Sequence, residues 1–186
     1  MMIAARHGNF AVKKGDKLAG TRIIPLVIEE EKMEAARKAA LEATEGAPIL
    51  DLLPFVHKKA GIVTTGNEVF YGRIKDTFTP VIEEKLAELS TEIIGHTVCN
   101  DDDSRVTASI LALIEEGADL VICTGGMSVD PDDKTPLAIK NTGADIISYG
   151  APVLPGAMFL LAYYKVTEGE NPRTVVIMGL PGCVMY

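Results

Sequence analysis

Three short segments rich in apolar and β-branched residues, each followed by a glycine-bearing turn, constrain the fold of this chain most. They occupy residues 60–65, 118–123 and 174–178. Segments with apolar residues at helical spacing, 80–89 and 104–116, separate the first of them from the second. This alternation predicts an α/β fold, a three-layer sandwich in which a mostly parallel sheet carries helices on both faces.

The rest of the pattern completes the predicted sheet. Residues 92–99 and 145–149 are expected to be strands, 136–141 a short helix and 158–164 an apolar helix. In open α/β sheets, ligands bind beyond the carboxyl ends of the strands. The three glycine-bearing turns should therefore meet at one edge, where the proline-bracketed loop 150–156 is a candidate pocket wall.

The turn after the second segment, Thr124-Gly125-Gly126-Met127-Ser128, is the leading candidate site. Adjacent glycines let a backbone approach a ligand closely and expose its N–H groups. Carboxylates crowd the next few residues, and their mutual repulsion is costly unless a cation or a chemical role offsets it. These carboxylates are Asp130, Asp132 and Asp133. The pattern points to a phosphate-bearing ligand held with a divalent metal.

Asp133 is the functional candidate in this turn, because its carboxylate could coordinate a metal or act on a substrate proton. The alternative is stabilisation of a helix start, where acidic residues are common. Thr135 is the expected N-cap of that helix, with Pro136 at its first position.

A second acidic cluster, Asp101-Asp102-Asp103, follows the strand expected at 92–99. Asp103 is the expected cap of the helix that begins at Ser104. A solvated loop explains Asp102 and Asp103 equally well, whereas Asp101, nearest the strand end, is the better functional candidate.

The first and last turns complete the candidate site. Asn67 and Glu68 suit hydrogen bonding to the N–H and NH₂ groups of a heterocycle, although turn formation alone also explains a Gly-Asn pair. The candidate binding residues are Thr65, Gly66, Asn67, Glu68, Thr124, Gly125, Gly126, Met127, Ser128, Gly179, Leu180, Pro181 and Gly182. The histidines show no partner pattern and are expected to be non-catalytic: His7, His57 and His96.

Residues 1–55 read differently and carry no evident chemistry. Strands are expected at 10–12 and 21–28, around a polar turn, followed by a solvated helix at 29–44. This part is interpreted as a small β extension with a helix, or a linker from a larger protein. The domain is expected to span 56–186 and to be truncated, because no covering helix follows Gly182.

Composition excludes several classes. The formal net charge of −8 argues against a nucleic-acid groove. The three cysteines show no zinc spacing, and a reducing cytoplasm fits them best. No apolar run reaches the length of a membrane span, and no signal-peptide pattern opens the sequence.

The blocks Thr65-Gly66-Asn67-Glu68, Thr124-Gly125-Gly126 with Asp133-Lys134-Thr135-Pro136, and Gly179-Leu180-Pro181-Gly182 resemble the molybdopterin-binding domain of molybdenum-cofactor biosynthesis proteins. The resemblance covers about residues 60–186. The family that it points to includes molybdopterin adenylyltransferases and molybdenum insertases. It implies a three-layer domain that binds the pterin dithiolene phosphate at the strand edge. It also implies catalysis by Asp101 and Asp133 with Mg²⁺ and ATP, in which the molybdopterin phosphate attacks the α-phosphate and releases pyrophosphate. Relatives assemble as dimers or trimers, so a homo-oligomer is expected.

The chain departs from the adenylyltransferase pattern. Met127-Ser128 replaces a further Thr-Gly, and an acidic residue, Asp130 or Asp132, stands where those enzymes tend to have a basic one. Residues 153–157 lack the lysine of the insertases, and Cys183-Val184 replaces the usual Asn-Pro. Loss of a basic residue weakens phosphate attraction, which puts nucleotide transfer in doubt more than pterin binding. Two alternatives stay open: a nucleotide-processing hydrolase resembling competence-damage-inducible proteins, and a non-catalytic pterin sensor.

Overall fold

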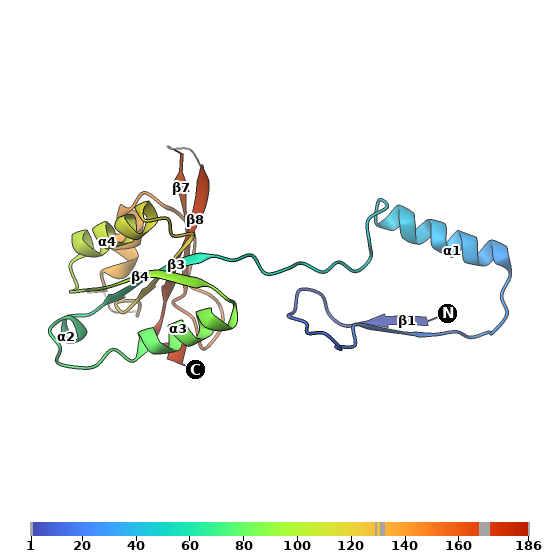
Figure 1. Cartoon of the computed structure of the whole chain (residues 1–186), viewed down its shortest axis with the longest axis horizontal. Helices are drawn as coiled ribbons and strands as arrows, with labels where there is room; N and C mark the ends of the chain where they lie inside the picture. Colours follow the sequence, from blue (N-terminus) through green and yellow to red (C-terminus); the bar gives the residue numbers. More distant parts are fainter. Residues whose placement is uncertain (1, 129, 131–132, 168–171, 186) are drawn as a thin grey trace. The chain divides into compact units, whose positions relative to one another are not determined.

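The computed structural model describes residues 2–128, 130, 133–167 and 172–185. Asp132, one of the three carboxylates of the acidic turn, lies outside the described residues. The chain divides into two compact units, Met1–Pro54 and Phe55–Tyr186 (Figure 1). No helix in the described part of the chain is both long and apolar enough to cross a membrane.

The first unit contains a two-stranded antiparallel sheet and one helix. Strand β1 (Met2–Ala5) pairs with β2 (Ala19–Arg22), and helix α1 (Glu30–Ala43) follows. The helix expected at 29–44 is therefore confirmed, and none of its residues, all of them described, is buried. The strand expected at 10–12 is wrong, because these residues lie in the long connection between β1 and β2. The strand expected at 21–28 overlaps β2 only at residues 21–22.

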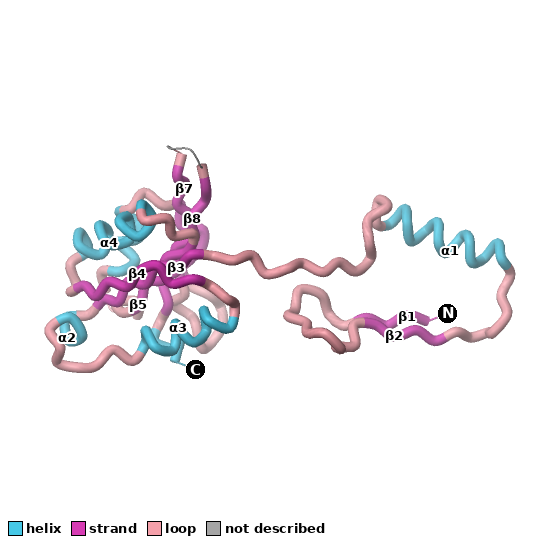
Figure 2. Tube along the Cα trace, viewed as in Figure 1, coloured by secondary structure: helices cyan, strands magenta, loops and turns pink. Residues whose placement is uncertain are grey.

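The second unit is built on a six-stranded sheet in the order β4-β3-β5-β8-β7-β6 (Figure 2). The parallel strands are β3 (Lys59–Thr65), β4 (Glu92–Cys99), β5 (Leu120–Thr124) and β8 (Arg173–Leu180). Strand β7 (Leu160–Val166) runs antiparallel to β8 and to β6 (Asp145–Tyr149). The expected fold class is confirmed, since most of the sheet is parallel.

Strand β7 corrects one expectation, because residues 158–164 were predicted to be helical. A seven-residue apolar run fits a strand or a buried helix equally well, and helices are usually longer. In the structure Leu160 and Ala162 are buried, whereas Leu161 and Tyr163 are more exposed. This period of two is that of a strand with one face toward the core.

Helices cover both faces of the sheet (Figure 1). On one face, α4 (Asp103–Glu115) and α5 (Thr135–Asn141) contribute buried apolar side chains to a core that includes Val63, Val121 and Ile177. On the other face, Ile82 and Leu86 of α3 (Phe78–Glu88) belong to a smaller core. Its strand residues are Ala60, Ile62 and Ile122. A single-turn helix, α2 (Asn67–Phe70), and a 3₁₀ turn, η1 (Gly182–Met185), follow β3 and β8.

Two expected helix caps are wrong. Helix α5 begins at Thr135, and its N-cap is Lys134, which makes no side-chain capping bond. The Thr135 hydroxyl instead bonds a carbonyl in the glycine turn. Asp102, not Asp103, caps α4, since its carboxylate accepts the N–H of Arg105.

Candidate functional site

Five loops leave the same edge of the sheet, one after each of β3, β4, β5, β6 and β8. In register, Thr64 of β3 lies beside Thr124 of β5, which in turn lies beside Leu180 of β8. The loops that follow these strands are loop 1 (65–68), loop 2 (124–128) and loop 3 (179–182). The structure thus places the three predicted turns at one carboxyl edge. Strand β6 runs in the same direction, so the proline-bracketed loop 150–156 leaves this edge as well.

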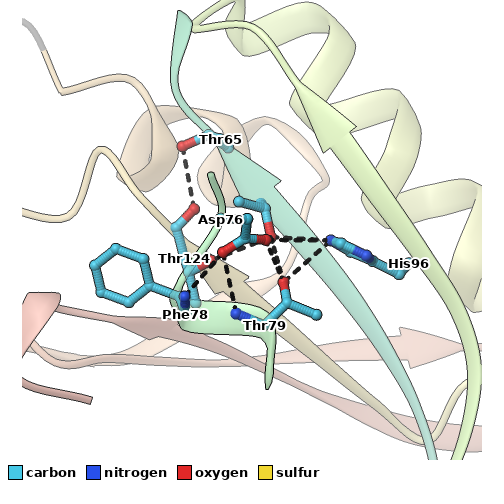
Figure 3. Close-up of polar contacts among 7 residues, drawn as sticks. Thr65, Asp76, Phe78, Thr79, His96 and Thr124 are labelled. Atoms are coloured by element: carbon cyan, nitrogen blue, oxygen red, sulfur yellow. Dashed lines mark hydrogen bonds and ion pairs between the residues drawn. The ribbon is translucent and has the colours of Figure 1, made fainter. Parts of the chain in front are cut away.

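Buried threonine hydroxyls join loop 1 to loop 2. The Thr65 hydroxyl donates to the Thr124 carbonyl at 3.2 Å (Figure 3). The same hydroxyl lies 3.1 Å from the Thr135 hydroxyl. The Thr135 hydroxyl donates to the Gly125 carbonyl at 2.8 Å. Thr65, Thr124 and Thr135 are all buried, so these bonds are shielded from competing water.

The paired glycines are required where loop 2 passes loop 1. Gly125 and Gly126 have φ angles of +82° and +53°, which side chains rarely adopt. A Cβ atom at Gly125 would also overlap the Thr65 carbonyl oxygen, and one at Gly126 would lie 2.9 Å from the Thr135 hydroxyl. The close approach leaves room for backbone only.

Met127 joins loop 2 to loop 3. Its side chain is buried and lies over Gly179, where a Cβ atom would stand 2.7 Å from the Met127 sulfur. The side chain of Met127, a predicted binding residue, is therefore part of the core. Only its backbone is left to face this edge of the sheet.

The two catalytic candidates each hold a loop through a backbone N–H group. Asp101 accepts the Asn67 N–H at 3.0 Å, and Asp133 accepts the Ser128 N–H at 2.5 Å. Asp101 thus connects the end of β4 to loop 1, whereas Asp133, just before α5, holds the last residue of loop 2. The strands that precede them, β4 and β5, flank β3.

The described residues offer little for a metal ion bound by protein alone. Among them, no group of three or more His, Cys, Asp or Glu side chains is arranged to hold a metal ion. A magnesium ion that arrives with a phosphate needs only one or two protein carboxylates, with phosphate and water completing its shell. Asp101 and Asp133 fit that limited requirement in residue type and in their placement at the same edge.

An apolar cavity of about 310 Å³ opens beside loop 3. Its lining comes from the loop after β6 and from the end of β8: Ala151, Val153, Gly156, Phe159, Leu180, Pro181 and Cys183. The proline-bracketed loop therefore lines a pocket, which was one of two roles that its sequence left open; the other was to position the segment that follows it. An apolar recess next to a polar loop suits a ligand with a flat ring and a charged group.

Sequence reasoning missed a polar cluster around Asp76, just before α3 (Figure 3). The Asp76 carboxylate accepts the N–H groups of Phe78 and Thr79 at 2.9 and 3.1 Å, and the Thr79 hydroxyl at 2.5 Å. The Thr64 hydroxyl donates to it at 3.3 Å. An acidic residue two positions before a helix start is a capping signal that could have revealed it.

The hydrogen bonds decide the charge of this carboxyl. Burial alone would raise the pKa of Asp76, but the donors from Thr79, Phe78 and Thr64 hold that pKa below its ordinary value. His96, expected to have no chemical role, joins the same cluster: its Nε2 lies 3.0 Å from the Thr64 hydroxyl and 3.2 Å from the Thr79 hydroxyl.

Comparisons with known proteins agree with this fold. Residues 61–186 match the family described as "probable molybdopterin binding domain". The tungsten cofactor synthesizing protein MoaB from Pyrococcus furiosus is similar in structure, with 25% identity, a TM-score of 0.57, and coverage of 74% of this chain and 86% of that one. A molybdopterin biosynthesis protein from Mycobacterium abscessus shares the fold at 18% identity and a TM-score of 0.53, covering 69% and 84% of the two chains.

A relative from another group matches a shorter stretch. A CinA-like protein of Mycobacterium tuberculosis is 39% identical over 80 residues, which is 43% of this chain. The match spans only 19% of that relative's length.

Proposed function

Since this chain belongs to the family of probable molybdopterin binding domains, we propose that its second unit binds molybdopterin or a related phosphorylated pterin, in the biosynthesis or handling of molybdenum cofactor. The observation that carries the proposal is the joining of loops 1, 2 and 3 at one carboxyl edge by Thr65, Thr135 and Met127. The ligand would lie across these loops.

Each loop has groups suited to a different part of such a ligand. The glycine turn of loop 2 brings backbone close to the ligand, which suits a phosphate. Asn67 and Glu68 are exposed on loop 1, where an amide and a carboxylate match the N–H and NH₂ groups of a pterin ring. The apolar cavity beside loop 3 supports a site at this edge.

Asp101 and Asp133 are proposed to act in Mg²⁺-dependent nucleotidyl transfer if the protein is an enzyme. They would hold Mg²⁺ together with phosphate oxygens, and the ion would neutralise charge on ATP and pterin phosphates. The chain itself would contribute positioning, because phosphoryl chemistry depends mainly on alignment and charge stabilisation.

The binding proposal is tested by titrating the chain with the fluorescent oxidised derivative of molybdopterin. Saturable binding is expected, and Glu68→Ala should weaken it about tenfold through loss of a charged hydrogen bond. Glu84→Ala, on the exposed part of α3, is the matched control and should bind as the wild type does. Absence of binding at concentrations that saturate a known family member would contradict the proposal.

A second candidate is a hydrolase acting on pyridine or ADP-ribose nucleotides. The 39% identity to CinA-like proteins favours it, although the match spans a fifth of their length. Mg²⁺-dependent release of phosphate from ADP-ribose, abolished in Asp133→Asn, would support this candidate. Tight pterin binding without turnover of any nucleotide would instead select a non-catalytic sensor. Homo-oligomeric assembly and a cytoplasmic location stay predictions.

A further inference from the structure

Loop 1 continues into a segment that polar contacts hold in place. Residues 66–77, all of them described, include no buried residue, so apolar packing contributes little to their order. This segment carries Asn67 and Glu68, the proposed ring-binding residues. Its position therefore depends on where its ends are fastened.

The near end is fastened to the end of β4. The Gly66 N–H donates to the Cys99 carbonyl at 3.2 Å, and the Asn67 N–H donates to Asp101 at 3.0 Å. The N–H groups of Arg73 and Ile74 then close the segment on the Glu68 carbonyl, at 2.8 and 3.2 Å.

Asp76 fastens the C-terminal end of the segment. The hydrogen-bonded cluster around it has few donor protons. A threonine hydroxyl has a single proton to donate. The Thr79 hydroxyl gives its proton to Asp76 at 2.5 Å, and the Thr64 hydroxyl lies within donating distance of the same carboxylate, at 3.3 Å. Both oxygens also face the His96 Nε2, at 3.0 and 3.2 Å. Three acceptors therefore compete for the Thr64 proton, because the Thr79 oxygen also lies 3.1 Å from the Thr64 oxygen. The Thr79 proton is held by the shortest bond, to Asp76, so the Thr79 oxygen accepts, and a hydrogen bond from Nε2 to it requires the proton on Nε2.

We propose that Asp76 and His96 are positioning residues for the ligand-facing loop: the Asp76 carboxylate sets the direction of the hydrogen bonds, and His96 holds a proton on Nε2. The network runs from His96 through Thr64 and Thr79 to Asp76. It fixes the C-terminal end of residues 66–77, and it thereby fixes the positions in which Asn67 and Glu68 face the ligand. The consequence for ligand binding rests on the proposed function, whereas the geometry of the network does not.

Asp76→Asn reverses the direction of the hydrogen bonds to the hydroxyls while leaving the size and shape of the side chain unchanged. The amide oxygen can still accept the N–H groups of Phe78 and Thr79, which preserves the helix start. Its NH₂ group then faces the hydroxyls and donates to them, so their protons turn toward His96. The Nε2 atom becomes an acceptor, and neutral His96 moves its proton to Nδ1.

The first experiment measures the His96 tautomer in the full chain by ¹⁵N NMR, at about pH 8.5, where an ordinary histidine is neutral. Wild type is expected to show the Nε2–H form and Asp76→Asn the Nδ1–H form. Asp145→Asn, at a surface ion pair with Lys165, is the control and should keep the wild-type tautomer. An Nδ1–H form in wild type, or an unchanged tautomer in Asp76→Asn, would overturn the proposal.

The second experiment measures amide hydrogen exchange of residues 66–77. Exchange should be about tenfold faster in Asp76→Asn, which replaces charge-assisted hydrogen bonds by weaker neutral ones, and in His96→Ala, which removes the bonds of the imidazole to the two hydroxyls. His96→Ala also keeps the test decisive if Asp76→Asn fails to fold. Exchange unchanged in a folded variant would contradict the positioning role.

Ligand affinity distinguishes this inference from the function on which it rests. Weaker binding of the fluorescent pterin derivative in His96→Ala, with a wild-type melting temperature, would support the coupling of network and site. Unchanged affinity despite faster exchange would overturn that coupling. If wild type binds no derivative, the proposed function fails, and the tautomer and exchange measurements still decide the network.

Discussion

The hydroxyl oxygens of Thr65 and Thr135 lie 3.1 Å apart although 70 residues separate them in the sequence. Thr65 ends β3, and Thr135 begins α5 after the acidic turn. Together they tie the glycine turn between them, through the carbonyls of Thr124 and Gly125. These buried hydroxyls therefore hold loops 1 and 2 of the proposed site together.

Thr65→Val should destabilise the domain by about 1–3 kcal/mol. Valine has a similar shape but cannot donate to the Thr124 carbonyl, which would then be buried with one partner fewer. Urea unfolding measures the change. Thr174→Val, at an exposed position of β8, is the control and should lie within about 0.5 kcal/mol of wild type. Equal stability of wild type and Thr65→Val would show that the hydroxyl contributes nothing.

Gly125→Ala and Gly143→Ala form a matched pair, since the two glycines have φ angles of +82° and +84°. Only at Gly125 would the new Cβ overlap a backbone atom, the Thr65 carbonyl oxygen; nothing lies within 4 Å at Gly143. Gly143→Ala should cost about 1 kcal/mol through conformational strain, and Gly125→Ala about 3 kcal/mol or more. Similar losses for both would contradict the close approach of loop 2 to loop 1.

Asp76 should contribute to stability at neutral pH and lose that contribution in acid. Its pKa is lower in the folded chain than in the unfolded chain, so the unfolded state binds a proton first as pH falls. The contribution is complete above the unfolded pKa, near 4, and disappears as pH falls through the folded value. Asp76→Asn should flatten the fall of unfolding free energy below about pH 4, measured by urea unfolding from pH 2 to 7. An acid limb as steep as wild type would rule out this carboxyl as its source.

The three cysteines should differ in reactivity toward an aromatic disulfide reagent at about pH 8. Burial, with a smaller contribution from Cys99, raises the pKa of Cys123 to about 12, so its thiolate is scarce. Cys99 is buried against Ser109, whereas Cys183 is partly exposed beside the apolar cavity. One thiol should react rapidly in the folded chain and three in urea. Cys183→Ser should remove the rapid phase; a second rapid thiol would contradict the described burial.

The spacing of apolar residues predicted most strands and helices of the second unit, because each of these elements carries the apolar period of its own type. Residues 60–65, 104–116 and 145–149 fall close to β3, α4 and β6. The error at β7 arose because seven apolar residues carry too little periodic information to separate strand from helix. The hairpin of the first unit was misplaced because few local signals distinguish a long connection from a tight turn.

The part of the site that could be predicted from sequence is the set of loops that follow the strand ends. Loops 1, 2 and 3 were expected together because parallel strands end at one edge. The contact of Met127 with Gly179 and the network of Asp76 with His96 depend on register between strands, which no local pattern encodes. His96 lacked any neighbour in sequence that would reveal its partners.

The most direct test of the account is amide hydrogen exchange of the full chain with and without molybdopterin, or its fluorescent oxidised derivative, at a saturating concentration. The account predicts slower exchange in loop 1, loop 2 and loop 3, with little change in α1 and in the β1–β2 sheet. Protection confined to regions outside these three loops, or none at all, would contradict a pterin site at this edge.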